Sequence, residues 1–102
     1  MAPSHVYPAA AVDAISAVDF VFKSSSSLGA DPDRIAIGGN SAGGNLSAVA
    51  LHHCALSNYP LCYAALYIPE LHINCDGAFH YSFQQSGSLA ALPQEIMVWF
   101  WK

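Results

Sequence analysis

The sequence predicts an α/β protein in which parallel strands are joined by crossover helices. Helix-like and strand-like apolar segments alternate over the first two-thirds of the 102 residues, and turn residues separate them. This alternation is typical of a parallel sheet covered by helices. Of all residues 54% are hydrophobic and only 10% are charged, against a usual charged share of roughly 25%. We therefore expect the interior part of a larger domain.

The first expected element is a helix over residues 9–27. Apolar residues from Ala11 to Phe22 follow the i, i+3, i+4, i+7 spacing of one helical face, and Asp19 lies off that face. Pro8 suits the first turn of a helix, and Gly29 is placed to terminate it.

The next elements alternate in the same way. Asp31-Pro32-Asp33 predicts a turn, and a buried strand is expected at Ile35–Ile37, which ends at two glycines. A second helix is expected over residues 42–56, followed by a strand at Cys62–Ile68. Beyond it we expect an irregular connection over residues 70–88 and a last helix at Ile96–Trp101.

Charge and cysteine content exclude several classes of function. Nucleic-acid binding needs clustered basic residues, whereas Lys23, Arg34 and Lys102 are scattered. No apolar run approaches the roughly 18 residues of a membrane span. The first residues do not form a secretory signal, and the three cysteines are an odd number without a C-x-x-C pair. These observations favour a cytoplasmic protein with buried free thiols.

One pentapeptide carries the chemistry: Gly39-Asn40-Ser41-Ala42-Gly43, a G-x-S-x-G pattern between the expected strand and helix. This context predicts a nucleophile elbow, a sharp turn that lifts Ser41 Oγ above the sheet edge. We expect glycine at 39 and 43 because a β-carbon at either position would clash. The N–H of Ala42 is placed to stabilise an oxyanion. A chance glycine turn is the alternative.

Other sites are disfavoured by their spacing. Neither Gly38 nor Gly39 begins a G-x-G-x-x-G or P-loop pattern, so we expect no nucleotide cofactor. His72, Cys75 and His80 lack zinc-ligand spacing, so we expect no metal. Asn45 begins a glycosylation pattern, but a structural role is expected there because it falls in the first turns of the second helix.

Several segments resemble the hormone-sensitive-lipase-like branch of the α/β-hydrolases. They are Tyr7–Ala10, Gly29–Ile35, Gly39–Leu46, Tyr67–Pro69 and Met97–Trp101. Asn40 departs from the aspartate that usually precedes the nucleophile in this branch. The resemblance implies one partial α/β-hydrolase domain over residues 1–102. This domain would lack the N-terminal strands, the His-Gly-Gly-type oxyanion loop and the C-terminal segment with the catalytic acid and histidine.

The resemblance implies an esterase or lipase that hydrolyses small carboxylic esters. Ser41 would attack the acyl carbon, a histidine would act as base and then acid, and a carboxylate would orient that histidine. In this family the acid and histidine follow the serine well downstream, and we expect neither in this chain. The resemblance implies no cofactor.

Two alternatives stay open. His52 and His53 lie about 16 Å or more along the expected helix from Ser41, out of its reach, whereas His72 or His80 could follow an acid in the required order. The other possibility is a non-catalytic product of a truncated or split gene that associates through exposed sheet edges.

Overall fold

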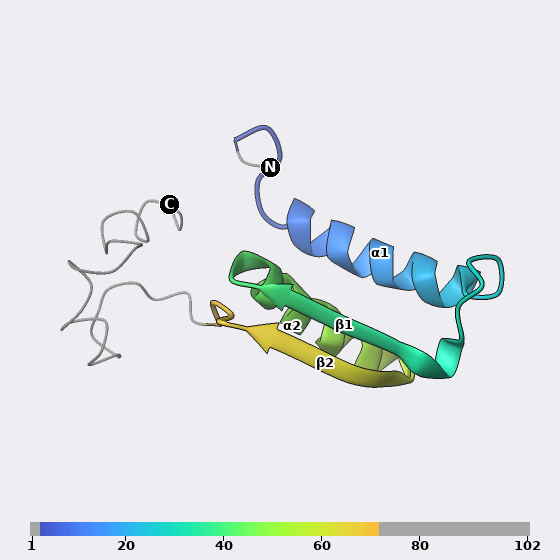
Figure 1. The fold of residues 1–102 in the computed structure, drawn as a ribbon. Coiled ribbons are helices and arrows are strands. Elements are labelled where there is room, and N and C mark those ends of the chain that lie inside the picture. Colours follow the sequence, from blue (N-terminus) through green and yellow to red (C-terminus); the bar gives the residue numbers. More distant parts are fainter. Residues whose placement is uncertain (1–2, 72–102) are drawn as a thin grey trace. The chain divides into compact units, whose positions relative to one another are not determined.

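The computed structural model describes residues 3–71 (Figure 1). Its elements in chain order are α1 (Ala9–Ser24), η1 (Pro32–Arg34), β1 (Ile35–Asn40), α2 (Ala42–Ser57) and β2 (Leu61–Tyr67). The chain divides into two compact units, Met1–Glu70 and Leu71–Lys102, and all five elements belong to the first. The single domain expected over residues 1–102 stays a prediction. The helix expected at Ile96–Trp101 and nearly all of the connection expected over residues 70–88 lie outside the described residues.

Helix α1 ends in the serine- and glycine-containing segment where the sequence predicted its end. The regular helix stops at Ser24, three residues earlier than expected, and a tightened turn continues to Gly29, whose φ is +68°. The N–H of Ala30 donates to the Ser25 carbonyl at 2.9 Å, and the N–H of Gly29 donates to the Ser26 carbonyl at 3.3 Å. This pair of bonds is a Schellman motif, so the predicted role of Gly29 is confirmed.

The apolar face predicted for α1 is the face that is half-buried in the structure. Its members are Ala11, Ala14, Ile15, Val18, Val21 and Phe22. Asp19 was expected off this face, but it is also half-buried because it contacts His53 of α2. No residue of α1 is fully buried.

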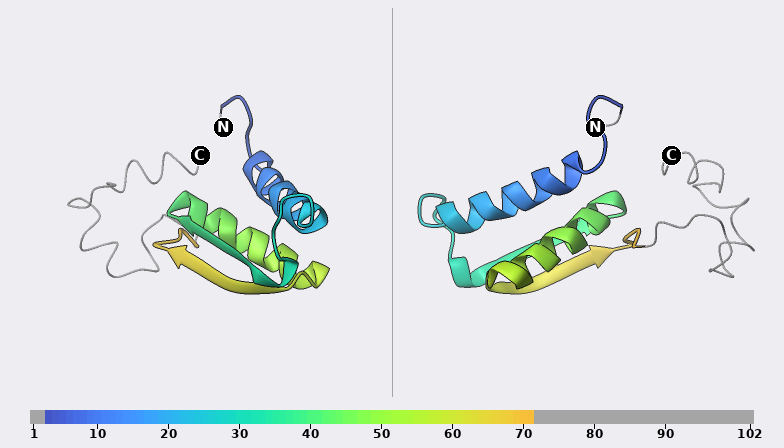
Figure 2. Two further views of the ribbon diagram at one scale, coloured as in Figure 1. Left: turned by 45° about the vertical axis from the view of Figure 1, so that its right-hand side comes forward. Right: turned by 180° about the vertical axis from the view of Figure 1, so that it is seen from behind.

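Strands β1 and β2 form a parallel pair, and α2 is the crossover between them (Figure 1). The register aligns Ala36 with Tyr63 and Asn40 with Tyr67, after an irregularity between Ile35 and Ala36. The predicted α/β class with parallel strands and crossover helices is confirmed. The expected full burial of the first strand is wrong: half-buried and exposed residues alternate along β1, because α2 covers one face of this two-stranded sheet (Figure 2).

Small residues let α2 approach the sheet closely. Its buried residues are Gly44, Ser47, Ala50 and Cys54, which recur at the spacing of one helical face. Asn58 then ends the helix in the left-handed conformation, with φ at +54°. Cys54 is a buried free thiol as expected, but Cys62 is exposed, since β2 turns alternate side chains away from α2.

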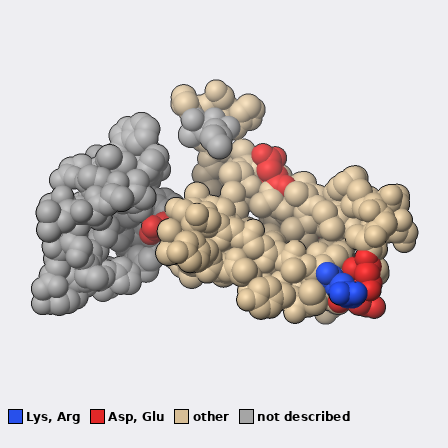
Figure 3. Space-filling model, viewed as in Figure 1, with Lys and Arg blue, Asp and Glu red and all other residues tan. Residues whose placement is uncertain are grey.

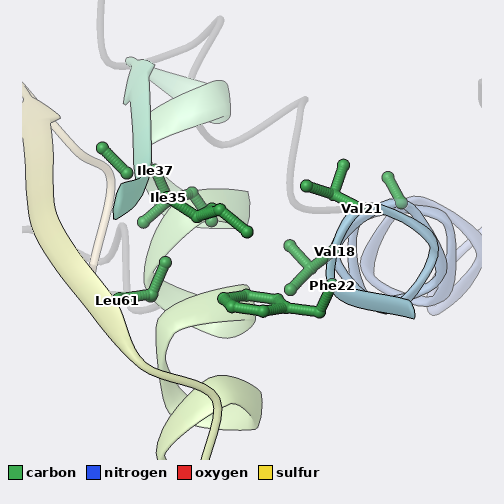
Figure 4. Close-up of a pocket in the computed structure, with 8 residues that line it drawn as sticks. Val18, Val21, Phe22, Ile35, Ile37 and Leu61 are labelled. Carbon is green, nitrogen blue, oxygen red and sulfur yellow. The ribbon is translucent and has the colours of Figure 1, made fainter. Parts of the chain in front are cut away.

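Helix α1 leaves an open groove beside the sheet. Val18, Val21 and Phe22 point across it toward strand residues Ile35 and Ile37 (Figure 4). The groove has a volume of about 150 Å³, and its lining is almost entirely apolar. Helix α1 therefore packs mainly against α2 and only lightly against the strands.

Charged side chains are sparse on the surface of this unit. Most of the face in Figure 3 carries neither acidic nor basic residues, as the low charge of the sequence predicts. Among residues 3–71, neither helix is long and apolar enough to cross a membrane.

Candidate active site

Ser41 occupies the single residue between the end of β1 and the start of α2. Its φ is +54° and its ψ is −118°, a conformation that costs a non-glycine residue about 1–3 kcal/mol. Two backbone hydrogen bonds of 3.0 Å hold it: the Ser41 N–H donates to the Tyr67 carbonyl, and the Asn45 N–H donates to the Ser41 carbonyl. The serine is thus fixed from the neighbouring strand and from the helix that it begins.

The glycines around Ser41 differ in their steric role. A β-carbon on Gly39 would overlap the Gly43 carbonyl and lie 2.7 Å from Ser47 Oγ, so the close approach of β1 and α2 requires glycine at 39. The same expectation for Gly43 is wrong within the described part of the chain, where a β-carbon would meet nothing within 4 Å. The second tight position is Gly44, whose β-carbon would lie 3.0 Å from Pro69.

The first turn of α2 supplies donors beside the serine. Ala42 is the first residue of the helix, and the first four N–H groups of a helix have no intrahelical acceptor. The helix dipole adds partial positive charge at this end. An anion next to Ser41 would therefore meet the Ala42 N–H.

Within residues 3–71 no histidine forms a hydrogen bond with the Ser41 side chain. His53 lies on the fourth turn of α2, and its Nε2 is 2.8 Å from Asp19 Oδ1 on α1. Ser57 Oγ approaches the same nitrogen at 3.4 Å. A histidine that relays a proton between a serine and an acid must contact them through its two different ring nitrogens, so this trio is not a catalytic triad.

Asp19 accepts hydrogen bonds from two side chains at the other end of the helix pair, Lys23 and His53. Lys23 Nζ lies 2.6 Å from Asp19 Oδ2, and this hydrogen bond, with a second from His53, lowers the pKa of Asp19 to about 2. The hydrogen bond between Lys23 and Asp19 in turn raises the pKa of Lys23. Nothing in the sequence pattern signalled the contact between Asp19 and His53, because these residues lie 34 positions apart on different helices.

Asn45 has the structural role that its position predicted. Its Nδ2 donates to the Glu70 carbonyl at 2.5 Å, so the amide that glycosylation would modify is already bonded. Among the residues described, no group of three or more His, Cys, Asp or Glu side chains could hold a metal ion. The candidate ligands His72, Cys75 and His80 lie outside that range.

A parallel sheet, a helical crossover and a strained serine at the strand–helix turn define a protein of the α/β-hydrolase class. In agreement, the protein family described as alpha/beta hydrolase fold matches residues 1–102. The chain belongs to this family, and the predicted resemblance to its hormone-sensitive-lipase-like branch is confirmed.

Three known proteins show how similar the chain is to other members. An AB hydrolase superfamily protein of Schizosaccharomyces pombe is 33% identical over 98% of this chain and 30% of its own length. The carboxylesterase NlhH of Mycobacterium tuberculosis is 51% identical over 48% of this chain and 15% of its own. The crystal structure of EstE1, a thermostable carboxylesterase from a metagenomic library, matches 96% of this chain and 34% of its own with a TM-score of 0.84 and 36% identity.

The chain thus spans about a third or less of the length of these relatives. The matches to the Schizosaccharomyces pombe protein and to EstE1 cover nearly the whole chain. Carboxylesterases are therefore among its relatives.

Proposed function

We propose that the chain carries the nucleophile of a carboxylic-ester hydrolase. The observation that carries the proposal is the conformation of Ser41, a strained serine held between β1 and α2 in a chain whose relatives include carboxylesterases. A serine hydroxyl at such a turn is presented to a substrate, and the next helix aims N–H donors at the same place.

The proposed chemistry is acyl transfer to Ser41. Its Oγ attacks the acyl carbon of a small ester while a histidine removes the hydroxyl proton, and the same histidine then protonates the leaving alcohol. The Ala42 N–H donates to the oxyanion that forms at the former carbonyl. Water releases the acid in a second half-reaction by the same steps.

We propose further that the catalytic histidine and acid are supplied from outside this chain. His53 is engaged with Asp19, twelve residues along α2 from Ser41, or about 18 Å at 1.5 Å per residue. The relatives that hydrolyse esters are about three times as long as the chain. The chain alone would then show only the small residual rate that remains when triad members are removed.

Hydrolysis of short-chain p-nitrophenyl esters by the full chain tests both parts of this proposal. We expect turnover far below that of an intact esterase, and we expect Ser41→Ala to change it little, because the residual rate without a base and an acid comes from the oxyanion donors and substrate binding. Turnover typical of an intact esterase would show that the base and acid lie within the chain. Turnover of that size that Ser41→Ala leaves unchanged would exclude Ser41 as the nucleophile.

A second candidate function is association through the sheet. In the described residues both outer edges of the β1–β2 pair are unpaired, and Tyr63 and Tyr67 of β2 are 67% and 69% exposed. Unpaired edges and apolar faces are sites where other chains add. Sedimentation analysis tests this candidate: a monomer with a cooperative thermal transition would contradict it, and self-association would support it.

A further inference from the structure

Two residues just beyond the G-x-S-x-G pattern fasten α2 to the segment that follows β2. Gly44 is buried, and a β-carbon there would lie 3.0 Å from Pro69 Cα and Cβ. Asn45 Nδ2 donates to the Glu70 carbonyl at 2.5 Å. Adjacent residues of one helical turn therefore contact adjacent residues of the same segment.

These contacts extend the bond that holds Ser41. The Ser41 N–H meets the Tyr67 carbonyl, Gly44 meets Pro69 and Asn45 meets Glu70. The first turn of α2 thus contacts residues 67–70, the end of β2 and the segment after it, in the same order along both segments. Ile68 lies within this segment with φ at +41°, a conformation that L residues seldom adopt. Contacts with other parts of the chain must therefore hold the segment in this conformation.

Asn45 links the serine and the segment through its two ends. Its backbone N–H donates to the Ser41 carbonyl at 3.0 Å, and its side chain donates to Glu70. A strained residue persists only where its surroundings over-determine its conformation. Within the described residues, Asn45 supplies the side-chain hydrogen bond that joins the helix of Ser41 to the segment after β2.

We propose that Asn45 is a positioning residue for Ser41. Its side-chain amide holds residues 68–70 against the first turn of α2, which keeps the Tyr67 carbonyl on the Ser41 N–H and the serine in its strained conformation. The catalytic meaning of this arrangement rests on the proposed function, whereas the arrangement itself can be tested without any ester.

The test is hydrogen exchange of the Ser41 amide, measured by NMR in the full chain. Asn45→Asp is nearly isosteric, but its carboxylate cannot donate to the Glu70 carbonyl. At pH 7 we expect the protection factor of the Ser41 amide to fall about tenfold, which corresponds to one net hydrogen bond of about 1.4 kcal/mol. Below a pH of about 3.9 a protonated carboxyl regains a donor, so the protection should recover relative to the wild-type chain at the same pH.

Asn40→Asp is the matched control. It makes the same chemical change at the exposed residue before Ser41. The native carboxyl groups near the site, among them Glu70 and Asp19, are present in both variants, so the comparison isolates the carboxyl introduced at 45. Asn40→Asp should leave the Ser41 protection factor near the wild-type value at pH 7 and should show no recovery in acid.

Unchanged protection of Ser41 in a folded Asn45→Asp variant would overturn the proposal. If that variant does not fold, the exchange of the Asn45 side-chain amide protons is measured in the wild-type chain instead. Slow exchange together with a nuclear Overhauser contact to residues 70–71 supports the proposal. Free exchange of these protons overturns it. None of these readouts depends on turnover, so the failure of this inference and that of the ester-hydrolase proposal are distinguishable.

Discussion

The backbone N–H of Ser41 donates a 3.0 Å hydrogen bond to the carbonyl of Tyr67, the last residue of β2. Because Asn40 pairs with Tyr67 in the parallel register, this bond continues the ladder one step past β1. The residue with the strained backbone is therefore attached to the sheet. Attachment to a rigid element suits a reacting group, since catalysis requires its atoms to be placed within about 0.5 Å.

The two glycines of the G-x-S-x-G pattern should respond in opposite ways to alanine. In Gly39→Ala the new methyl overlaps the Gly43 carbonyl, and we expect a loss of about 1–3 kcal/mol in the free energy of unfolding. In Gly43→Ala the methyl enters open space in the first helical turn, and we expect a gain of about 0.5–1 kcal/mol. Urea unfolding of both variants measures the difference, and equal costs would contradict the packing described for β1 and α2.

Because the backbone of Ser41 is strained, we predict that removing its β-carbon increases the free energy of unfolding. Ser41→Gly relieves about 1–3 kcal/mol of backbone strain at an entropic cost of about 0.5–1 kcal/mol, so we expect a net gain of about 1 kcal/mol. Ser41→Ala keeps a β-carbon and is the matched control, with little change expected. The account fails here if urea unfolding finds the glycine variant less stable than the alanine variant.

The contacts of Asp19 predict a loss of stability in acid. Its pKa lies at about 2 in the folded chain, against 3.8 as the ordinary value, chiefly because Lys23 donates to it. A carboxyl with a lowered folded pKa stabilises the folded state above pH 3.8, and this contribution is lost as the pH falls toward about 2.

Thermal unfolding between pH 5 and pH 2 measures this effect. Asp19→Asn should be less stable than the wild-type chain at pH 5, and the two should converge near pH 2. Asp13→Asn, which changes an exposed carboxylate on the same helix, should follow the wild-type curve. A constant difference between Asp19→Asn and the wild-type chain over this range would show that Asp19 does not contribute through its charge.

The local features of the fold followed from local patterns in the sequence. The apolar spacing from Ala11 to Phe22 predicted the half-buried face of α1, and Gly29 terminates that helix with φ at +68°, as its position predicted. Strand burial was predicted less well. The run at Ile35–Ile37 looked buried on both sides, but the described part of the chain covers only one face of the sheet.

Contacts between residues far apart in the sequence could not be predicted from such local patterns. Ser41 and its turn could be located because the pattern, the strand and the helix are contiguous in the chain. The bonds that hold the turn join it to Tyr67 and Glu70, about 25 residues away, and no local periodicity encodes them. The same is true of Asp19 and His53. Gly43 was given the steric role that belongs to Gly44 because the position of Pro69 was unknown.

The central claim is that Ser41 is an esterase nucleophile, and ester hydrolysis in a completed domain tests it most directly. Residues 1–102 would replace the equivalent third of the carboxylesterase EstE1, which supplies the rest of the fold, and a cooperative thermal transition would establish that the chimera folds. We predict hydrolysis of p-nitrophenyl butyrate that Ser41→Ala lowers by about 10⁴-fold or more. A folded chimera without activity, or one that Ser41→Ala leaves equally active, would contradict the claim.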